Sequence, residues 1–484
     1  MVASPERLVG HATKRTDAPA KLTGQERYAG DLEIPGLLHA RPVLSAHAHA
    51  KLTGIDATAA KQVPGVVAVL TAADLPFAPS GAPPRAAESL ASVEAVYVGQ
   101  PVALVIAENE AAAETAAALV EIGYEVLPAV LDREAAMKLD SPKTRVLTKV
   151  GEDAAEAAMH GIGGGAAQEE PQERVSSNVS GQTHMTLGDI AQGFAEAEVT
   201  AEGTYSTEWV HQSYIEPQTC VAAPDYMGGV TLHASTQGIF RTRQVVAQTL
   251  GLQDHQVRIV PMPVGGGFGG KFGLIEPLTA GAALAVRRPV RLAFTRSEDL
   301  LTANPTPAHT ISVKIGAKRD GTITALQARL VVDTGAYPNS PMGGTAFAIA
   351  GCYRIPNLDI KGYEVLTNRL GPGAYRAPGN PQASFAVESV LDDLAGKLGM
   401  DPIAFRLKNV PVEGDSRPDG KPWPRIGLRE CLEYLAEHPR WKDRATNGAR
   451  SNGRVREGSA LVSGAGAAGW SLRRRCATSI RPGR

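Results

Sequence analysis

The chain has 484 residues, of which 43% are hydrophobic and 20% are charged, and its formal net charge at pH 7 is −1. Because single hydrophobic cores stop growing near roughly 250 to 300 residues, this length predicts two or three domains. The near-zero net charge argues against a general nucleic-acid binder and against a protein that binds anionic membranes.

The cysteines are few and far apart: Cys220, Cys352, Cys431 and Cys476, without a C-x-x-C pair. This spacing encodes neither a disulfide framework nor an iron–sulfur or structural zinc site. Electrons from any redox reaction would therefore leave through another polypeptide. The first residues lack the apolar stretch of a signal peptide, and no apolar run approaches the roughly 20 residues of a spanning helix. We expect a cytoplasmic protein.

Residues 10–135 predict one compact α/β domain. Short apolar runs indicate strands over Val66–Leu70 and Pro101–Ala107, and an alanine-rich stretch indicates a helix over Glu108–Val120. Residues 136–185 are rich in Gly, Glu, Gln and Ser and predict a linker.

Residues 186–457 predict a second, larger unit that mixes strands and helices. Its clearest elements are strands over Thr310–Ile315 and Ile323–Asp333 and a helix over Ser384–Leu398. The last segment, 458–484, consists mainly of Gly, Ala, Ser and Arg without apolar periodicity, which predicts a disordered tail. The expected fold class is α+β.

Six glycines occupy the nine residues 265–273, and they fit two nucleotide-binding patterns incompletely. The glycines match G-x-G-x-x-G, and together with Lys271 they also match G-x-x-x-x-G-K. A phosphate loop would need Ser or Thr next, where Phe272 stands. A dinucleotide fingerprint would need an unbroken buried strand before it, which Pro261 and Pro263 interrupt. The cluster still predicts a loop whose backbone N–H groups come close to a ligand.

Further segments accompany this cluster: HQSYIEPQ (211–218), STQG (235–238), RRPVR (287–291), CYRIPN (352–357), GAYRAPG (373–379) and DPIAFRLKN (401–409). In order and spacing they resemble the molybdenum-binding large subunit of the xanthine dehydrogenase and aldehyde oxidase family. LHARP (38–42) and GQPVA (99–103) resemble its hammerhead domain. The resemblance implies an α/β hammerhead domain at 10–135 and the first half of a mixed α+β molybdopterin-binding domain at 186–457.

The resemblance also implies cofactors and partners. The chain would bind molybdopterin with molybdenum, in bacteria commonly as the cytosine dinucleotide. It would hydroxylate an aldehyde or heterocycle carbon with oxygen from water. An iron–sulfur subunit with 2Fe-2S clusters and an FAD-binding subunit would accept the electrons, because the cofactor carries the redox chemistry and the protein orients it.

The cofactor-binding residues implied by the resemblance are Gln237, Gly267, Phe268, Gly269 and Arg376. Gln237 offers a neutral amide donor to the oxygen ligands of molybdenum. The N–H groups of Phe268 and Gly269 would face the same ligands, as in an anion-binding nest. Arg376 would present its fork of donors to cofactor oxygens. No side chain of this chain is expected to bind the metal directly.

Departures from the family pattern bear on the substrate. Purine-oxidising members carry a glutamate, an arginine and a stacking phenylalanine where this chain has Phe272, Gly344 and Pro378. Carbon monoxide dehydrogenases carry a cysteine where this chain has Ala377. We therefore expect a substrate pocket shaped by Phe272 and Pro378 that favours aldehydes or apolar heterocycles over xanthine.

The family's catalytic glutamate lies in a C-terminal half that we expect to be missing, because the resemblance fades after Arg456. No catalytic residue is assigned in this chain, and Glu216 is interpreted as a structural acid. A truncated, inactive hydroxylase subunit is one interpretation. A non-catalytic fragment or a subunit-assembly partner without cofactor is the other.

Three histidines, His39, His47 and His49, could suggest a metal site. We interpret them instead as exposed loop residues of a family-typical segment.

Overall fold

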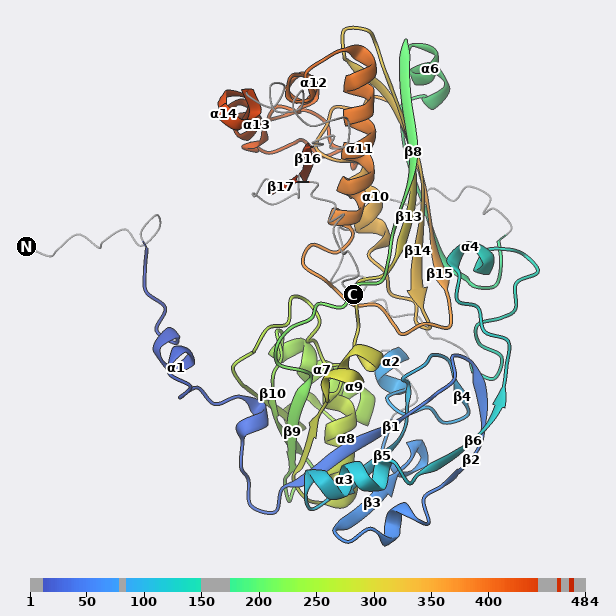
Figure 1. The fold of residues 1–484 in the computed structure, drawn as a ribbon, viewed down its shortest axis with the longest axis vertical. Coiled ribbons are helices and arrows are strands. Elements are labelled where there is room, and N and C mark those ends of the chain that lie inside the picture. Colours follow the sequence, from blue (N-terminus) through green and yellow to red (C-terminus); the bar gives the residue numbers. More distant parts are fainter. Residues whose placement is uncertain (1–11, 78–83, 149–174, 443–458, 463–469, 474–484) are drawn as a thin grey trace, which may run out of the picture.

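The computed structural model describes residues 12–77, 84–148, 175–442, 459–462 and 470–473. These residues form sheets of seven, five, three and two strands, together with helices. Figure 1 shows the larger sheets in two separate bodies, one below the other. The mixture of sheets and helices confirms the predicted α+β class.

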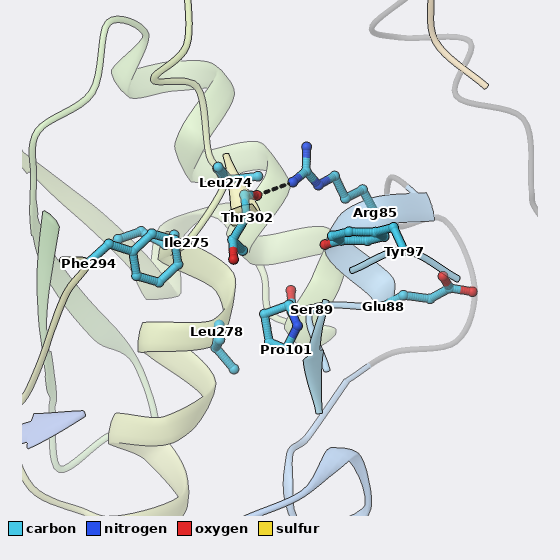
Figure 2. Close-up of a pocket in the computed structure, with 10 residues that line it drawn as sticks. All are labelled: Arg85, Glu88, Ser89, Tyr97, Pro101, Leu274, Ile275, Leu278, Phe294 and Thr302. Atoms are coloured by element: carbon cyan, nitrogen blue, oxygen red, sulfur yellow. Dashed lines mark hydrogen bonds between the residues drawn. The ribbon is translucent and has the colours of Figure 1, made fainter. Parts of the chain in front are cut away.

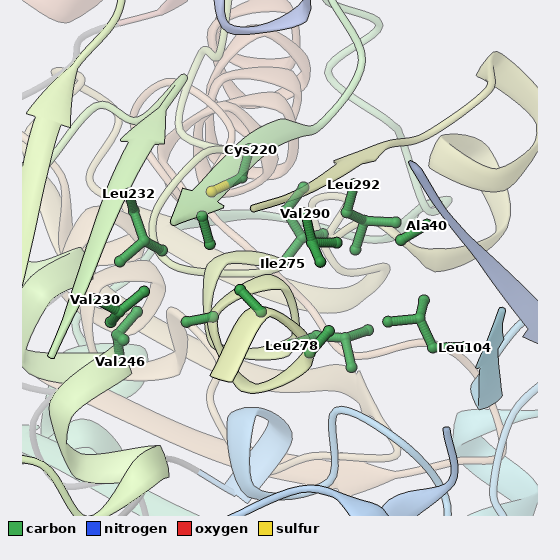
Figure 3. Close-up of a cluster of buried hydrophobic side chains, with 14 of the residues drawn as sticks. Ala40, Leu104, Cys220, Val230, Leu232, Val246, Ile275, Leu278, Val290 and Leu292 are labelled. Carbon is green, nitrogen blue, oxygen red and sulfur yellow. The ribbon is translucent and has the colours of Figure 1, made fainter. Parts of the chain in front are cut away.

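The seven-stranded sheet has the order β11 (Val257–Pro261), β10 (Val230–Ala234), β9 (Thr219–Pro224), β12 (Val290–Ala293), β1 (Leu38–Leu44), β5 (Pro101–Ala107) and β3 (Val66–Leu70). Helices α7 (Ile239–Leu250) and α8 (Glu276–Val286) pack on one face, where one of the two main apolar clusters lies (Figure 3). Helix α3 (Glu110–Ala117) packs on β1 and β5.

Strand β5 is buried along its whole length because both of its faces are covered. Leu104 and Ile106 belong to the cluster beneath α8, whereas Val105 packs with Ala116 of α3. A strand buried on both faces has an apolar run rather than an alternating pattern, so the prediction over Pro101–Ala107 is confirmed. Helix α3 starts later than predicted because Asn109 caps it, its Oδ1 accepting from Ala112 N at 2.9 Å.

The five-stranded sheet has the order β7 (Val179–Leu187), β15 (Leu358–Leu366), β14 (Ile323–Gly335), β13 (His309–Ala317) and β8 (Val199–Thr207). Helices α10 (Met342–Ala350) and α11 (Asn380–Leu398) pack against it around a second apolar cluster. The strands predicted within β13 and β14 and the helix predicted within α11 are confirmed.

Helix α12 (Pro402–Asn409) is joined to α11 by a buried ion cluster. Arg406 is fully buried, and its guanidinium nitrogens lie 2.7 Å from Glu388 Oε2 and 2.7 Å from Asp392 Oδ1. Because the guanidinium has two acidic neighbours, the free-energy cost of burying its charge is offset, and the ion pairs fix α12 against α11.

The remaining elements are shorter. A three-stranded sheet has the order β4 (Glu94–Ala95), β2 (Ala50–Asp56) and β6 (Glu121–Val126). The other helices are α1 (Ala18–Leu22), α2 (Pro84–Ala87), α4 (Arg133–Ala136), α6 (Ile190–Ala195), α9 (Arg296–Thr302), α13 (Leu428–Glu437) and α14 (Pro439–Lys442), with 3-10 turns at Ala29–Asp31, Ala60–Gln62, Ala72–Asp74 and Asp254–Gln256.

The limits of the predicted domains stay predictions. Some strands pair across these limits or begin inside the predicted linker. Strand β1 pairs in parallel with β12, so one sheet joins residues 38–44 to residues 290–293. Strand β7 begins inside the predicted linker, since it pairs with β15, far away in sequence. Strands β16 (Ser459–Val462) and β17 (Trp470–Arg473) pair inside the tail for which no regular structure is predicted. Residues 149–174 of the linker and the rest of the tail lie outside the described residues.

Candidate cofactor site

The glycine cluster lies between β11 and α8, and its lysine points into the protein. Pro261 ends β11, an edge strand, where a missing N–H is tolerated. Lys271 is fully buried, and its Nζ lies 2.8 Å from Glu216 Oε2 and 3.1 Å from Ser235 Oγ. Burial lowers the pKa of Lys271, and the hydrogen bond to Glu216 opposes this shift. A lysine whose Nζ is buried and paired with Glu216 is not available to a phosphate, which argues against the phosphate-loop interpretation.

Glu216 anchors the start of the cluster. Its Oε2 accepts hydrogen bonds from Gly265 N at 2.7 Å and from Ser235 Oγ at 2.5 Å, in addition to Lys271 Nζ. Its backbone N–H donates to Gly265 O at 3.1 Å. Glu216 therefore has the structural role that its sequence context predicts.

Gln237 follows β10 and lies against the same loop. Its Oε1 accepts from Gly269 N at 2.9 Å, and its backbone N–H donates to Lys271 O at 2.9 Å. A Cβ atom on Gly267 would lie 2.4 Å from Gln237 Oε1, so a larger residue here would displace the Gln237 amide. With Oε1 committed to the loop, the group that Gln237 offers to a ligand is its NH₂.

Arg376 reaches the loop from the segment before α11. Its backbone N–H donates to Phe268 O at 2.9 Å. The φ angles of Phe268, Arg376 and Ala377 are 51°, 21° and 62°, all in the left-handed region that non-glycine residues seldom adopt. Such backbone strain persists where surrounding contacts impose it, and it gathers at functional sites. The three segments predicted to bind one cofactor thus meet in space.

The geometry changes one expectation within this site. The prediction that the Gly269 N–H faces a ligand is wrong, because this N–H donates to Gln237 Oε1; the neighbouring N–H of Phe268 is not used by that bond. Gly269 has a different constraint, because a Cβ there would lie 2.6 Å from Ala374 O. Gly269 therefore serves close packing between the loop and the Arg376 segment.

The two predicted pocket residues, Phe272 and Pro378, lie near residues predicted to bind the cofactor, and neither of them lines the pocket shown in Figure 2. Phe272 packs against Gly238, whose added Cβ would lie 2.9 Å from the ring. Pro378 is half-buried two residues after Arg376. The pocket in Figure 2 is elsewhere: it lies at the start of α8 and is lined by residues that include Arg85, Tyr97, Leu274, Leu278 and Thr302.

A buried acid lies behind the glycine cluster at the start of α8. Glu276 is 1% exposed, and its Oε2 accepts from Ile275 N at 3.2 Å. Desolvation raises the pKa of Glu276 to about 7, although Lys271 and the backbone N–H groups oppose the shift. The sequence carries no signal for Glu276, because a glutamate in the first turn of a helix is ordinary.

The interpretation of the histidines as exposed loop residues is wrong for His49. This side chain is buried, its Nε2 lies 2.8 Å from Glu94 Oε1, and its Nδ1 lies 2.6 Å from Pro128 O. The interpretation is also wrong for His39, which is half-buried on strand β1, whereas His47 lies in a loop and is half-buried. Among the described residues, no group of three or more His, Cys, Asp or Glu side chains is arranged to hold a metal ion.

Two family models match the chain. The aldehyde oxidase and xanthine dehydrogenase a/b hammerhead domain matches residues 23–128, and the molybdopterin cofactor-binding domain matches residues 170–410. Together they define a class of protein in which a hammerhead domain precedes a domain for a molybdenum cofactor. The chain belongs to the aldehyde oxidase and xanthine dehydrogenase family, in which it is similar to part of the molybdenum-binding subunit.

Individual relatives agree with this assignment. The chain is 32% identical to the xanthine dehydrogenase molybdenum-binding subunit of Escherichia coli, covering 92% of this chain and 57% of that protein. It is 29% identical to the nicotinate dehydrogenase large molybdopterin subunit of Eubacterium barkeri, covering 89% of this chain and 96% of that subunit. The aldehyde oxidoreductase structure from Desulfovibrio gigas superposes with a TM-score of 0.78 at 28% identity, covering 92% of this chain and 47% of that one.

The chain therefore spans about half the length of several relatives. In the described part of the chain, no helix has the length and apolar character needed to cross a membrane.

Proposed function

We propose that this chain supplies the molybdopterin-binding part of a molybdenum hydroxylase that oxidises an aldehyde or heterocycle carbon with oxygen derived from water. Molybdopterin, which we propose is bound as the cytosine dinucleotide, provides the redox chemistry when it is present. Electrons would pass to an iron–sulfur subunit and then to an FAD-binding subunit. A cytoplasmic location is part of the same proposal.

One observation carries this proposal. Gln237, the glycine loop and Arg376 come from segments far apart in sequence, and they meet through two 2.9 Å hydrogen bonds, Gly269 N to Gln237 Oε1 and Arg376 N to Phe268 O. A cradle of small residues with amide, backbone N–H and guanidinium donors suits a ligand rich in oxygen atoms. The residues present therefore fit a molybdopterin cofactor.

Each side chain has a definite task in this proposal. Gln237 donates from its NH₂ group, since its oxygen is already used. The exposed Arg376 side chain would offer its guanidinium donors to oxygen atoms of the same ligand. Glu216 is not proposed as the base, because Lys271, Ser235 and Gly265 hold its Oε2. The catalytic base is assigned to no residue of this chain.

The substrate class rests on Phe272 and Pro378. Both are half-buried and offer no hydrogen bond from their side chains. The names of the relatives include a xanthine dehydrogenase, a nicotinate dehydrogenase and an aldehyde oxidoreductase, so they support the reaction class but not one substrate.

The test is cofactor content. The wild-type chain, produced in cells that make molybdopterin, should purify with molybdenum and pterin in equimolar amounts, measured by elemental analysis and by fluorescence of the oxidised pterin. Gln237→Ala should lose most of both, whereas Asn409→Ala, a buried amide outside the site, should retain them. A folded wild-type chain without molybdenum or pterin would favour the non-catalytic alternative.

A further inference from the structure

Gln212, which was not among the predicted site residues, joins two chain segments beneath the glycine loop. Its side chain is buried, with 4% exposed. Its Nε2 donates to Ala374 O at 2.7 Å and to Asn304 O at 2.8 Å. Two carbonyl acceptors fix which end of the amide is nitrogen, because a carbonyl oxygen only accepts.

The carbonyl of Ala374 determines how the Arg376 segment meets the loop. Ala374 O occupies the space beside Gly269 where a Cβ would lie 2.6 Å away. Two residues later, Arg376 N donates to Phe268 O at 2.9 Å. The hydrogen bond from Gln212 therefore acts on the contact between two segments of the proposed cofactor site.

Arg85 of α2 bridges the same segments from the hammerhead domain. Its Nη1 donates to Gly371 O at 3.1 Å, and its Nη2 donates to Ala303 O at 3.2 Å and to Thr302 O. Figure 2 shows the bond between Arg85 and Thr302. Donors from two separate parts of the chain thus join residues 302–304 to residues 371–374.

The buried amide of Gln212 indicates that its N–H donors have a structural role. Its Oε1 is buried and has no hydrogen-bond partner among the described residues. An unpaired buried oxygen costs stability, and an apolar side chain of similar size would avoid that cost. The two donated bonds are what an apolar residue could not supply.

We propose that Gln212 is a positioning residue that holds the Arg376 segment against the glycine loop through the Ala374 carbonyl. Any effect of Gln212 on molybdopterin binding rests on the proposed function. Its effect on the position of the Arg376 segment does not, because the hydrogen bond from Arg376 N to Phe268 O lies within this chain.

The test compares Gln212→Met, Gln212→Glu and Asn409→Leu in the full chain. Asn409 is a matched control, since its buried Nδ2 donates to Gly321 O at 2.8 Å and Phe405 O at 2.9 Å, outside both segments. Hydrogen exchange with mass spectrometry measures the protection of the Arg376 amide. We expect Gln212→Met to reduce this protection on the order of tenfold, and Asn409→Leu to leave it unchanged.

Gln212→Glu adds a pH readout. A carboxylate would face two carbonyl oxygens, whereas the protonated acid can donate one hydrogen bond. Protection of the Arg376 amide in this variant should therefore be higher at pH 5 than at pH 8, after correction for intrinsic exchange, while in Gln212→Met it stays low at both pH values.

Each outcome decides the proposal. Unchanged protection of the Arg376 amide in Gln212→Met overturns it. Loss of protection in step across β14 would give Gln212 a general stabilising role and also overturn it. Pterin content is measured in the same samples: a wild type without pterin contradicts the proposed function, and the exchange result still decides the role of Gln212.

Discussion

Lys271 holds Gln237 by two backbone hydrogen bonds while its own side chain is fixed at Glu216. Gln237 N donates to Lys271 O at 2.9 Å, and Lys271 N donates to Gln237 Oε1 at 3.4 Å. The Lys271 Nζ lies 2.8 Å from Glu216 Oε2 and 4.8 Å from the centre of the Tyr214 ring. A buried ion pair thus anchors the backbone segment that orients Gln237, which is proposed to bind the cofactor.

Removing one partner of this pair should be costly. Lys271→Met would leave Glu216 largely buried without its cation, and such changes destabilise proteins by about 3–5 kcal/mol. We expect a clear drop in the free energy of unfolding, measured by denaturant titration, and a partial recovery in the double variant Lys271→Met, Glu216→Gln.

Lys408→Met is the matched control, because Lys408 pairs with Asp320 at 3.1 Å on the surface. Exposed pairs contribute about 0–1 kcal/mol. Equal effects of the two lysine substitutions would contradict the anchoring role of Lys271.

Glu276 should make stability depend on pH. Burial raises its pKa from 4.5 to about 7, so between these values the folded chain holds a proton that the unfolded chain has lost. Stability from this group is full below about pH 4.5 and is lost as the pH rises towards 7, by about 3 kcal/mol in total. Glu276→Gln keeps the shape of the side chain but cannot titrate. The stability of this variant relative to wild type should therefore increase between pH 5 and pH 8. A constant difference in melting temperature across that range would refute this prediction.

Much of the fold follows from local sequence, and the site does so only in part. The apolar run at Pro101–Ala107 predicts a strand because burial on both faces leaves a local signature. The pairing of β1 with β12 leaves none, since its partners are some 250 residues apart. The prediction for His49 is wrong for the same reason: the burial of its ring depends on Glu94 and Pro128, which lie in other segments.

The glycine cluster shows the same limit within the site. Its glycine content predicts that other atoms approach the backbone closely, but it does not identify those atoms. At Gly267 and Gly269 the close neighbours are Gln237 Oε1 and Ala374 O, both from distant parts of the chain. Gln212 had a sequence signal, its place in the family-like segment HQSYIEPQ, but its partners Asn304 and Ala374 could be identified only in three dimensions.

Gly269→Ala should disrupt the contact between the loop and the Arg376 segment. The added Cβ would lie 2.6 Å from Ala374 O, and the φ angle of 105° is unfavourable for alanine. We expect a lower melting temperature and reduced pterin content. Gly396→Ala in α11 is the control: its Cβ would meet nothing within 4 Å, so it should leave pterin content unchanged and stabilise the helix by about 0.5–1 kcal/mol. Retention of wild-type stability and pterin by Gly269→Ala would contradict the packing argument.

The substrate prediction follows from Phe272, whose ring packs against Gly238, the residue after Gln237. An apolar ring leaves the polar edge of a purine unpaired, and sites without hydrogen-bond partners discriminate against polar substrates. The assembled enzyme should therefore have a higher kcat/KM for aldehydes or apolar heterocycles than for xanthine.

Phe272→Glu should shift the ratio of the two kcat/KM values towards xanthine on the order of tenfold. Phe240→Glu, at a phenylalanine that is 71% exposed on α7, adds the same charge without that contact and should leave the ratio unchanged. Comparable kcat/KM for xanthine and aldehydes in the wild type would overturn the pocket assignment, and an equal shift in both variants would attribute it to charge alone.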